Sequence, residues 1–482
     1  DLKKSYSQVR KELKNYSKDL LKKDEIVVLN KTDLLDNKEV KKINTKFRSI
    51  ITKIPVPESI PILKRVYETE SHSMHGQLPI IWDRAEGVQV YDSWGNKWLD
   101  FSSTIFVANA GHSNKRIVES LKKVLDKPLL QTYNYSSPER HEYLDYLIKN
   151  TPGYFEKAFL LSAGSEATEA VLKLMRLNGL IYNRRKKGVI CFEGNWHGRT
   201  MGAQMMGWNP SQKEWIGYLD PNIYHIPFPY KHVIKNQDPK TFLKDSLEKL
   251  FKKQNINPKT DICGVMMETF QGWGACFYPK EYVQEISKFC KSNNILLSFD
   301  EMQAGFGRTG KFFAYEHYDV APDLVICGKG ISGSVPLSSV LGSAELIELD
   351  PGYTSTHGGN PLACAAGLGN LEAFEDLNLV GESERKGKIM LDILLSWKEK
   401  YPSRIGSILG NGLLFGVFIT KENSEELDPD LTNYICERAM EKGVFSICTG
   451  RGTLKLGPPL SIPDDALIEG LRVYKECFDE LF

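Results

Sequence analysis

The sequence predicts an α/β fold in which a large domain holds a mostly parallel central sheet and a smaller C-terminal α/β domain follows. Between about residues 110 and 370, short apolar runs alternate with helical stretches, and this alternation is typical of a parallel sheet covered by helices. Polar residues follow the ends of several runs, where such sheets carry their functional sites. The runs are residues 157–161, 188–192, 261–267, 294–299, 323–327 and 338–342.

The segments on either side of this region are predicted to form separate parts. Residues 87–100 alternate in polarity around Gly95 and Asn96, so we expect a hairpin there. The prolines between residues 55 and 61 indicate a linker, and two long helices around the apolar run 412–419 indicate the smaller domain. The predicted parts are an N-terminal extension (1–55), a segment that packs with the small domain (56–110), a large domain (111–370) and a small C-terminal domain (371–482).

Composition and charge are those of an ordinary globular enzyme. The 482 residues carry a net charge of +1, and 41% are hydrophobic. No apolar run approaches the roughly 18 residues of a membrane span, and the basic start lacks the core of a signal peptide. The nine cysteines form no C-x-x-C pair, so we expect neither a metal site nor a disulfide framework, and a cytoplasmic location. The basic excess in residues 1–55 is better explained by a solvated helix than by a nucleic-acid site, so we expect neither a nucleic-acid nor a membrane partner.

Two charged residues at successive strand ends point to a cofactor. Asp300 closes one apolar run, and Lys329 follows the next, between Gly328 and Gly330. A lysine amine can form a Schiff base with the aldehyde of pyridoxal phosphate. A carboxylate can pair with the pyridinium nitrogen and keep it protonated, so that the ring takes up electrons. We therefore predict that Lys329 and Asp300 are catalytic residues of a pyridoxal phosphate enzyme.

Two glycine-containing segments could bind the rest of this cofactor. Gly164 and Ser165 follow a strand end and open a helix, where backbone N–H groups can hold a phosphate. The alternative is an ordinary helix cap with Ser165 at the N-cap. Trp196 and His197 leave the 188–192 strand in a loop bounded by glycines, and the indole ring could stack on the pyridine.

Three further polar residues are candidates for the same site. Glu268 stands at the end of the 261–267 strand, as Asp300 does on its own strand. Gln303 follows Asp300 by three residues and could donate a hydrogen bond to the phenolate oxygen of the cofactor. Thr356 offers a hydroxyl in a glycine-rich segment that precedes a helix of small residues.

These motifs, in this order, resemble those of the class III aminotransferases, which have the fold-type I architecture of pyridoxal phosphate enzymes. The resemblance runs from about Ile80 to the C-terminus. It implies that Lys329 binds the cofactor aldehyde, and that Thr356 reaches the phosphate of a neighbouring subunit, so that a homodimer is expected. The matching motifs are Gly-Ser-Glu-Ala, Trp-His-Gly-Arg-Thr, Asp-Glu-Met-Gln, Gly-Phe-Gly-Arg-Thr-Gly, Gly-Lys-Gly and Gly-Gly-Asn-Pro-Leu-Ala.

The activity implied by this resemblance is the transfer of an amino group from an amine or ω-amino acid donor to an oxo acid. Two other pyridoxal phosphate activities stay open, an intramolecular aminomutase of the glutamate-1-semialdehyde type and a decarboxylating relative.

Two departures from the family pattern bear on the substrate. Trp273 stands where many members have a glutamate, and Lys455 stands in an apolar segment where they have an arginine. In 4-aminobutyrate-type enzymes these two residues form a gate that lets the arginine bind a carboxylate. Lysine offers a point charge without the planar fork of arginine, so we expect weaker 2-oxoglutarate recognition, preference for a smaller acceptor such as pyruvate, and an apolar donor beside Trp273. The alternative is that Arg451 binds the carboxylate.

Three nucleotide-binding motifs are present in incomplete form. Gly305–Gly310 matches the dinucleotide fingerprint but lacks a following helix, and Phe312 stands where a phosphate-binding loop needs Ser or Thr. Residues 1–50, with Asn30-Lys31-Thr32-Asp33, resemble a fragment of an Obg-family GTPase. No phosphate-binding loop precedes this motif, so we expect a remnant that is dispensable for transamination. The alternative from another class is a GTP-binding regulatory protein.

Overall fold

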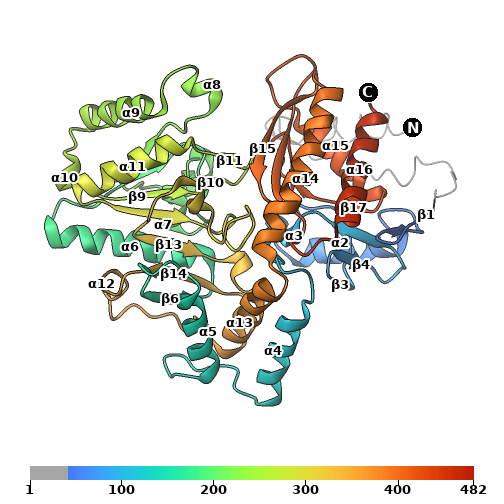
Figure 1. Ribbon diagram of the computed structural model, residues 1–482, viewed down its shortest axis with the longest axis horizontal. Coiled ribbons are helices and arrows are strands. Elements are labelled where there is room, and N and C mark those ends of the chain that lie inside the picture. The colour runs from blue at the N-terminus through green and yellow to red at the C-terminus, as the bar shows by residue number, and fades with distance from the viewer. Residues whose placement is uncertain (1–41) are drawn as a thin grey trace, which may run out of the picture. The chain divides into compact units, whose positions relative to one another are not determined.

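The apolar runs predicted as strands come together in one seven-stranded sheet of the computed structural model (Figure 1). The strand order is β6-β14-β13-β12-β9-β7-β8, and the pairing is parallel except at β14, which is antiparallel to both neighbours. All six predicted runs are strands. The edge strand β8 was not predicted, because His225 interrupts its short apolar run. The strands are β6 (Lys157–Leu161), β7 (Gly188–Phe192), β8 (Ile223–Ile226), β9 (Ile262–Glu268), β12 (Leu296–Asp300), β13 (Leu324–Cys327) and β14 (Ser338–Gly342).

The structure describes residues 42–482, which form one unit. The Asn30–Asp33 motif, and with it the resemblance of residues 1–50 to a GTPase fragment, lies almost wholly outside the described residues. Within the described part of the chain, no helix is long and apolar enough to cross a membrane.

Helices cover both faces of the seven-stranded sheet. Alternate strand residues point to opposite faces, and Val189 and Cys191 accordingly join the cluster around α6 (Gly164–Tyr182), while Ile190 and Phe192 join the larger cluster. That larger cluster also includes the buried hydrophobic side chains of α9 (Pro239–Gln254) and α11 (Lys280–Asn293). Figure 1 shows α6 and α11 on opposite sides of β9. The other helices of this region are α4 (Lys115–Asp126), α5 (Pro138–Lys149), α7 (Met201–Met206), α8 (Lys231–Ile234), α9 (Pro239–Gln254), α10 (Pro258–Asp261), α11 (Lys280–Asn293), α12 (Ala344–Ile347) and α13 (Pro361–Asp376).

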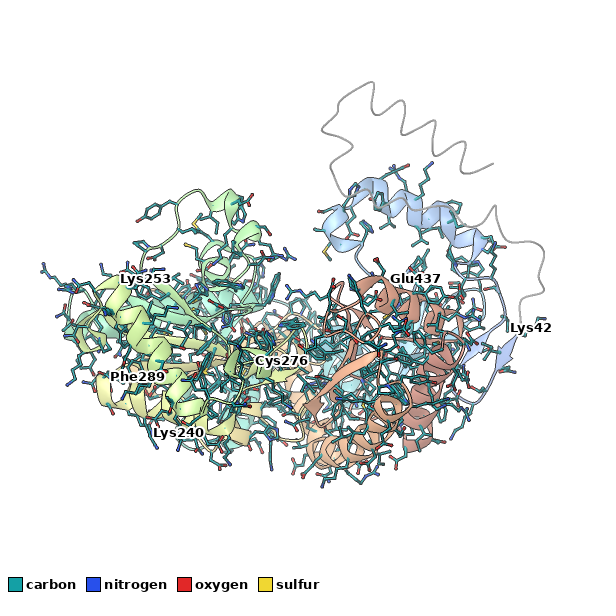
Figure 2. The ribbon with its side chains drawn as sticks, turned by 90° about the horizontal axis from the view of Figure 1, so that it is seen from above. Lys42, Lys240, Lys253, Cys276, Phe289 and Glu437 are labelled. Atoms are coloured by element: carbon teal, nitrogen blue, oxygen red, sulfur yellow. The ribbon has the colours of Figure 1, made fainter. Side chains whose placement is uncertain are left out.

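The C-terminal region contains a four-stranded antiparallel sheet in the order β15-β16-β19-β18. Three helices accompany it, where the sequence predicted two. Figure 2 shows Cys276, in the short hairpin β10–β11, between the part that holds Phe289 of α11 and the part that holds Glu437 of α15. The elements are β10 (Phe270–Gln271), β11 (Cys276–Phe277), α14 (Leu379–Lys400), β15 (Ile405–Asn411), β16 (Leu414–Ile419), α15 (Pro429–Glu441), β18 (Ile447–Cys448), β19 (Thr453–Leu456) and α16 (Asp464–Asp479).

A third sheet joins the two ends of the described chain. The predicted hairpin is present as β4 and β5, and β5 also pairs with β2 and, in parallel, with β17. Strands within residues 42–50 therefore belong to the same sheet as strands within residues 84–100. The folded unit thus extends further towards the N-terminus than the limit predicted at residue 56. The other predicted domain limits stay predictions. The strands are β1 (Ile43–Asn44), β2 (Ser49–Ile50), β3 (Arg84–Glu86), β4 (Gln89–Tyr91), β5 (Lys97–Asp100) and β17 (Val444–Phe445).

The linker predicted at residues 55–61 is wrong in part. A short 3-10 turn, Pro57–Ser59, leads directly into α2 (Ile60–Thr69). Pro57 and Pro61 lie in the first turns of these elements, where a missing N–H group costs no hydrogen bond. The prolines therefore begin a helix here, whereas the prediction took them only as helix breakers.

Candidate active site

A cavity of about 250 Å³ lies at the carboxyl ends of three neighbouring strands. Glu268 and Asp300 are the last residues of β9 and β12 and are direct partners in the parallel register. Partners on adjacent strands point to the same face of a sheet, so both carboxylates face the cavity. Lys329 follows two residues after β13. Eight of the predicted cofactor residues line this cavity, namely Gly164, Ser165, Trp196, His197, Glu268, Asp300, Gln303 and Lys329.

The Asp300 carboxylate is held by a chain of hydrogen bonds. Its Oδ2 lies 2.9 Å from His197 Nδ1, and its Oδ1 accepts from the Met302 N–H at 3.0 Å. Asn195 Nδ2 lies 2.9 Å from His197 Nε2. Because the amide donates to Nε2, the ring proton is placed on Nδ1, and His197 donates to Asp300. This chain keeps the carboxylate in one orientation at the end of β12.

Glu268 is the second buried carboxylate of the cavity. It accepts the backbone N–H groups of Trp196 and Gly272, each at 2.9 Å. Burial, reinforced by the negative charge of Asp300, raises the pKa of Glu268 to about 7, although His197 and the two N–H groups act in the opposite direction. Its side chain thus ties the loop of Trp196 to the loop after β10.

Lys329 projects its amine into the same cavity from a strained backbone position. Its φ of 47° lies in the left-handed region, which costs free energy for a residue other than glycine and is a feature of functional sites. Burial lowers the pKa of the amine, while Asp300 and Glu268 act to raise it. A lowered pKa leaves more of the amine in the neutral, nucleophilic form.

The N-terminus of α6 forms the other end of the cavity. Ala163 is the N-cap and Glu166 accepts the N–H of Ser162 at 2.9 Å, so the alternative that Ser165 is the N-cap is wrong. The Ser165 hydroxyl instead accepts the N–H of Arg199 at 3.2 Å. A Cβ on Gly198 would lie 2.2 Å from that hydroxyl, so only glycine allows this approach. The helix N-terminus attracts negative charge.

A second cavity of about 520 Å³ adjoins the first, and Trp196 and Gln303 line both. All three predicted substrate residues, Trp273, Arg451 and Lys455, line the second cavity. The indole N–H of Trp273 points to the hydroxyl of Tyr230 at 3.3 Å and to Gln271 Oε1 at 3.2 Å.

The two cations of this second cavity differ in their surroundings. The exposed guanidinium of Arg451 lies 5.8 Å from the centre of the Trp273 ring. Lys455 on β19 is 3% exposed and donates to the Gly272 carbonyl oxygen and, at 2.6 Å, to Gln303 Oε1. Burial, together with the charge of Lys329, lowers the pKa of Lys455 to about 7.

Thr356 is the one predicted cofactor residue that lies outside both cavities. Thr356 is exposed, and its backbone carbonyl oxygen accepts a hydrogen bond from Gln131 Nε2 at 3.0 Å. The neighbouring Ser355 donates to Glu166 at 2.7 Å and so ties this loop to the start of α6.

Sequence reasoning missed several residues of the two cavities. Met302 lines the first, and the missing side chains of Gly164 and Gly328 leave room for its thioether. Its position between Asp300 and Gln303 in the Asp-Glu-Met-Gln motif could have identified Met302 as a residue of this cavity. Ile105 lines the second cavity from four consecutive left-handed residues, Ser103–Phe106. No glycine marks that turn, so it could not be predicted from the sequence.

The residues of the first cavity fit pyridoxal phosphate. A carboxylate, an amine and a helix N-terminus are the partners that a pyridinium nitrogen, an aldehyde and a phosphate require. Trp196 brings an aromatic ring to the same space. Both Asp300 oxygens are held by hydrogen bonds within the protein, so the protein itself orients this carboxylate.

Comparisons with known proteins agree with this geometry. The family model described as aminotransferase class-III matches residues 71–478. A probable 4-aminobutyrate aminotransferase of Bacillus subtilis is 34% identical over 81% of this chain and 91% of its own length. The 4-aminobutyrate aminotransferase of Escherichia coli is 33% identical over 84% of this chain and 95% of its own. The crystal structure of a Bacillus anthracis aminotransferase, 25% identical, superposes with a TM-score of 0.80 and covers 89% of this chain and 100% of that one.

Proposed function

The chain belongs to the class III aminotransferases, which transfer amino groups with pyridoxal phosphate, and from this premise we propose that Lys329 and Asp300 carry the reaction and that the donor is an amine or ω-amino acid. The observation that supports the proposal most is the meeting of Lys329, Asp300 and Glu268 at three neighbouring strand ends, with the α6 N-terminus in the same cavity.

Each polar residue has a separate task in this proposal. When bound, pyridoxal phosphate supplies an electron sink for the donor carbon that loses its proton. Asp300, oriented by His197, keeps the ring nitrogen protonated. The Lys329 amine would hold the cofactor aldehyde, and as a neutral base it would move the proton at the substrate carbon. Its lowered pKa favours the neutral form that can accept this proton.

The second cavity is the proposed position of the rest of the donor. Trp273 gives it an apolar wall, and Arg451 places an exposed guanidinium at its edge. The Lys455 amine already donates to two internal oxygens, so a substrate carboxylate would have to displace both. We therefore assign the carboxylate of an ω-amino acid to Arg451, whose planar fork suits that group. The B. subtilis and E. coli relatives are named for such a donor, 4-aminobutyrate.

The acceptor is proposed to be a small oxo acid such as pyruvate. A larger dicarboxylate needs a second well-matched cation, and burying a carboxylate without one is costly. Lys455 is the remaining cation of the second cavity among the described residues, and as a point charge it should bind 2-oxoglutarate more weakly.

A homodimer in the cytoplasm is the proposed working form. Thr356 is exposed and lies outside both cavities of its own chain, which supports a role at the phosphate end of a second copy's site. All nine cysteines are free thiols, as expected for a reducing compartment. Sedimentation of the holoenzyme should give twice the chain mass, and Thr356→Ala should weaken cofactor binding without changing that mass.

A screen of donors and acceptors tests the proposed function. The purified protein with pyridoxal phosphate should convert 4-aminobutyrate or an arylalkylamine to the carbonyl product, and pyruvate to alanine in equal amount. Release of CO₂ from an amino acid donor, or an isomerised amino acid without any acceptor, would instead indicate a decarboxylating enzyme or an aminomutase.

A further inference from the structure

Lys455 holds a position that substrate binding does not explain. Its amine is buried on β19, beneath the Phe106 ring at 4.7 Å, and donates to the Gly272 carbonyl oxygen and to Gln303 Oε1. Lys455 and Gln303 lie 152 residues apart in the sequence. The contact thus joins the four-stranded sheet to the segment that follows Asp300.

The chemistry of an ammonium group fixes which way the Gln303 amide faces. An ammonium has three donors and no acceptor, whereas a glutamine amide has an oxygen that accepts and an NH₂ that donates. The oxygen of Gln303 must therefore face Lys455, and its Nε2 must face away from it. The reverse orientation would bring NH₂ against NH₃⁺ and lose the hydrogen bond.

Gly272 leaves room for the Gln303 amide. A Cβ at residue 272 would lie 2.6 Å from Gln303 Nε2 and 2.9 Å from its Oε1, closer than real Cβ atoms approach. The Gly272 carbonyl oxygen meanwhile accepts from Lys455. Both sides of the Gln303 amide are thus defined by neighbouring residues, while the side chain also lines the cavity of Lys329 and Asp300.

We propose that Lys455 is a positioning residue, which turns the Gln303 amide so that its NH₂ group donates to the ring oxygen of the bound cofactor. The proposal rests on the proposed function, because it takes the cavity of Lys329 as the cofactor site. It assigns to Lys455 a role that requires no contact with the substrate.

A pH titration of the bound cofactor tests this role. The visible absorbance of the holoenzyme should change with pH in a single transition. In Lys455→Met the amide is free to turn away, the ring oxygen loses its donor, and the transition should move to higher pH by about one unit. Removal of the Lys455 charge would also raise the transition, so a second background is needed. In Gln303→Ala, adding Lys455→Met should produce little further shift if Lys455 acts through Gln303.

Three variants separate this role from general damage. Lys455→Arg keeps the donors and should restore most of the wild-type transition. Gly272→Ala, which changes no charge, should shift the transition in the same direction as Lys455→Met. Lys186 is the matched control, because it is 1% exposed and also donates to two carbonyl oxygens, of Lys259 and Asn293, away from both cavities. Lys186→Met should destabilise the protein without moving the transition.

Other outcomes would overturn the proposal. An equal shift by Lys455→Met in the wild-type and Gln303→Ala backgrounds would mean that its charge acts directly. A raised KM for carboxylate-bearing donors alone, with an unchanged transition and kcat, would make Lys455 the carboxylate-binding residue. Borohydride trapping distinguishes a wrong role for Lys455 from a wrong proposed function. If the cofactor remains attached to Lys329 in every variant, only the role of Lys455 is refuted.

Discussion

The two walls of the candidate active site are built in different ways. One wall consists of the ends of β9, β12 and β13, where neighbouring parallel strands bring Glu268, Asp300 and Lys329 together. The other wall consists of β19 and the turn before it, which carry Lys455 and Arg451 and belong to a different sheet. The first wall depends on local strand pairing, and the second depends on how two sheets meet.

This difference predicts that catalysis and substrate preference can change separately. The carboxyl ends of neighbouring parallel strands lie at the same edge of the sheet, whatever the conformation of the loops. Residues at these ends therefore keep their positions relative to one another. A residue on a second sheet can change without moving those strand ends. Trp273 and Lys455, the two residues at which the sequence resemblance implies a departure from the family pattern, both line the second cavity. We therefore expect changes there to alter selectivity and changes at the strand ends to abolish turnover.

The largest effect is expected at the end of β12. Asp300→Asn removes the charge that keeps the cofactor ring nitrogen protonated, so turnover should fall by about 10³-fold or more, with cofactor still bound. Asp323→Asn is the control, because the Asp323 carboxylate accepts the Leu297 N–H at 2.8 Å at the opposite end of β12. If Asp300→Asn retained a tenth of the wild-type turnover, strand-end convergence would not define the catalytic residues.

The second effect concerns the sheet that joins the two ends of the described chain. Arg48 is paired with Glu469 at 2.7 Å, with side chains 8% and 12% exposed, and it also donates to the Lys442 carbonyl oxygen at 2.5 Å. Arg48→Ala leaves the largely buried Glu469 carboxylate without its cation, with the Thr45 hydroxyl as a remaining donor. It should lower the free energy of unfolding by about 3 kcal/mol, as measured by urea denaturation.

An exposed ion pair between the same regions provides the control for Arg48. Lys46 and Asp465 lie 2.8 Å apart with side chains 72% and 57% exposed, so Lys46→Ala should cost less than about 1 kcal/mol. A chain that begins at Lys42 should fold like the full chain, whereas one that begins at Ile60 should be markedly destabilised. Equal stability of these two chains would show that residues 42–50 are dispensable, as the sequence first suggested.

The third effect is a pH dependence at Glu301, which follows Asp300 but points away from the cavity. Glu301 accepts from the Thr269 hydroxyl and from the N–H groups of Ala314 and Tyr315. Burial raises its pKa to about 7. The folded state therefore holds this proton more tightly than the unfolded state, and the associated stability is lost as pH rises from about 4.5 through 7.

Comparison with Glu301→Gln isolates this contribution in the cofactor-free protein. Between pH 5 and pH 8, the free energy of unfolding of the wild type should fall by about 2 kcal/mol relative to the variant. The lost acceptor of the variant costs the same at both pH values and cancels. A difference that stays constant, or that grows in favour of the wild type at high pH, would contradict the assigned direction.

The strand-end wall could be predicted from the sequence, and the other wall only in part. Apolar periodicity located the strands, so Asp300, Glu268 and Lys329 could be placed at their ends without a structure. The pairing of His197 with Asp300 joins residues 103 positions apart, and neither spacing nor residue type identifies such a contact. The left-handed turn that presents Ile105 has no glycine to reveal it.

The smallest effect is expected on the second wall. Arg451→Ala should raise the KM for a donor with a distal carboxylate by about tenfold, the loss of one exposed charge-assisted contact. It should leave an amine of similar length without a carboxylate unaffected. Steady-state kinetics with 4-aminobutyrate and with butylamine make this comparison. An equal rise for both donors would mean that Arg451 shapes the cavity without binding the carboxylate.

The central claim is that Lys329, on the strand-end wall, is the residue that binds the cofactor. Lys455 is the natural competitor, because it lines the adjoining second cavity and its pKa is lowered to about 7. The direct measurement is borohydride reduction of the full chain with pyridoxal phosphate, followed by proteolysis and mass spectrometry. We expect the added cofactor mass on the peptide with Lys329, and none on any site of Lys329→Ala. Cofactor mass on Lys455, or an adduct that persists in Lys329→Ala, would contradict the account.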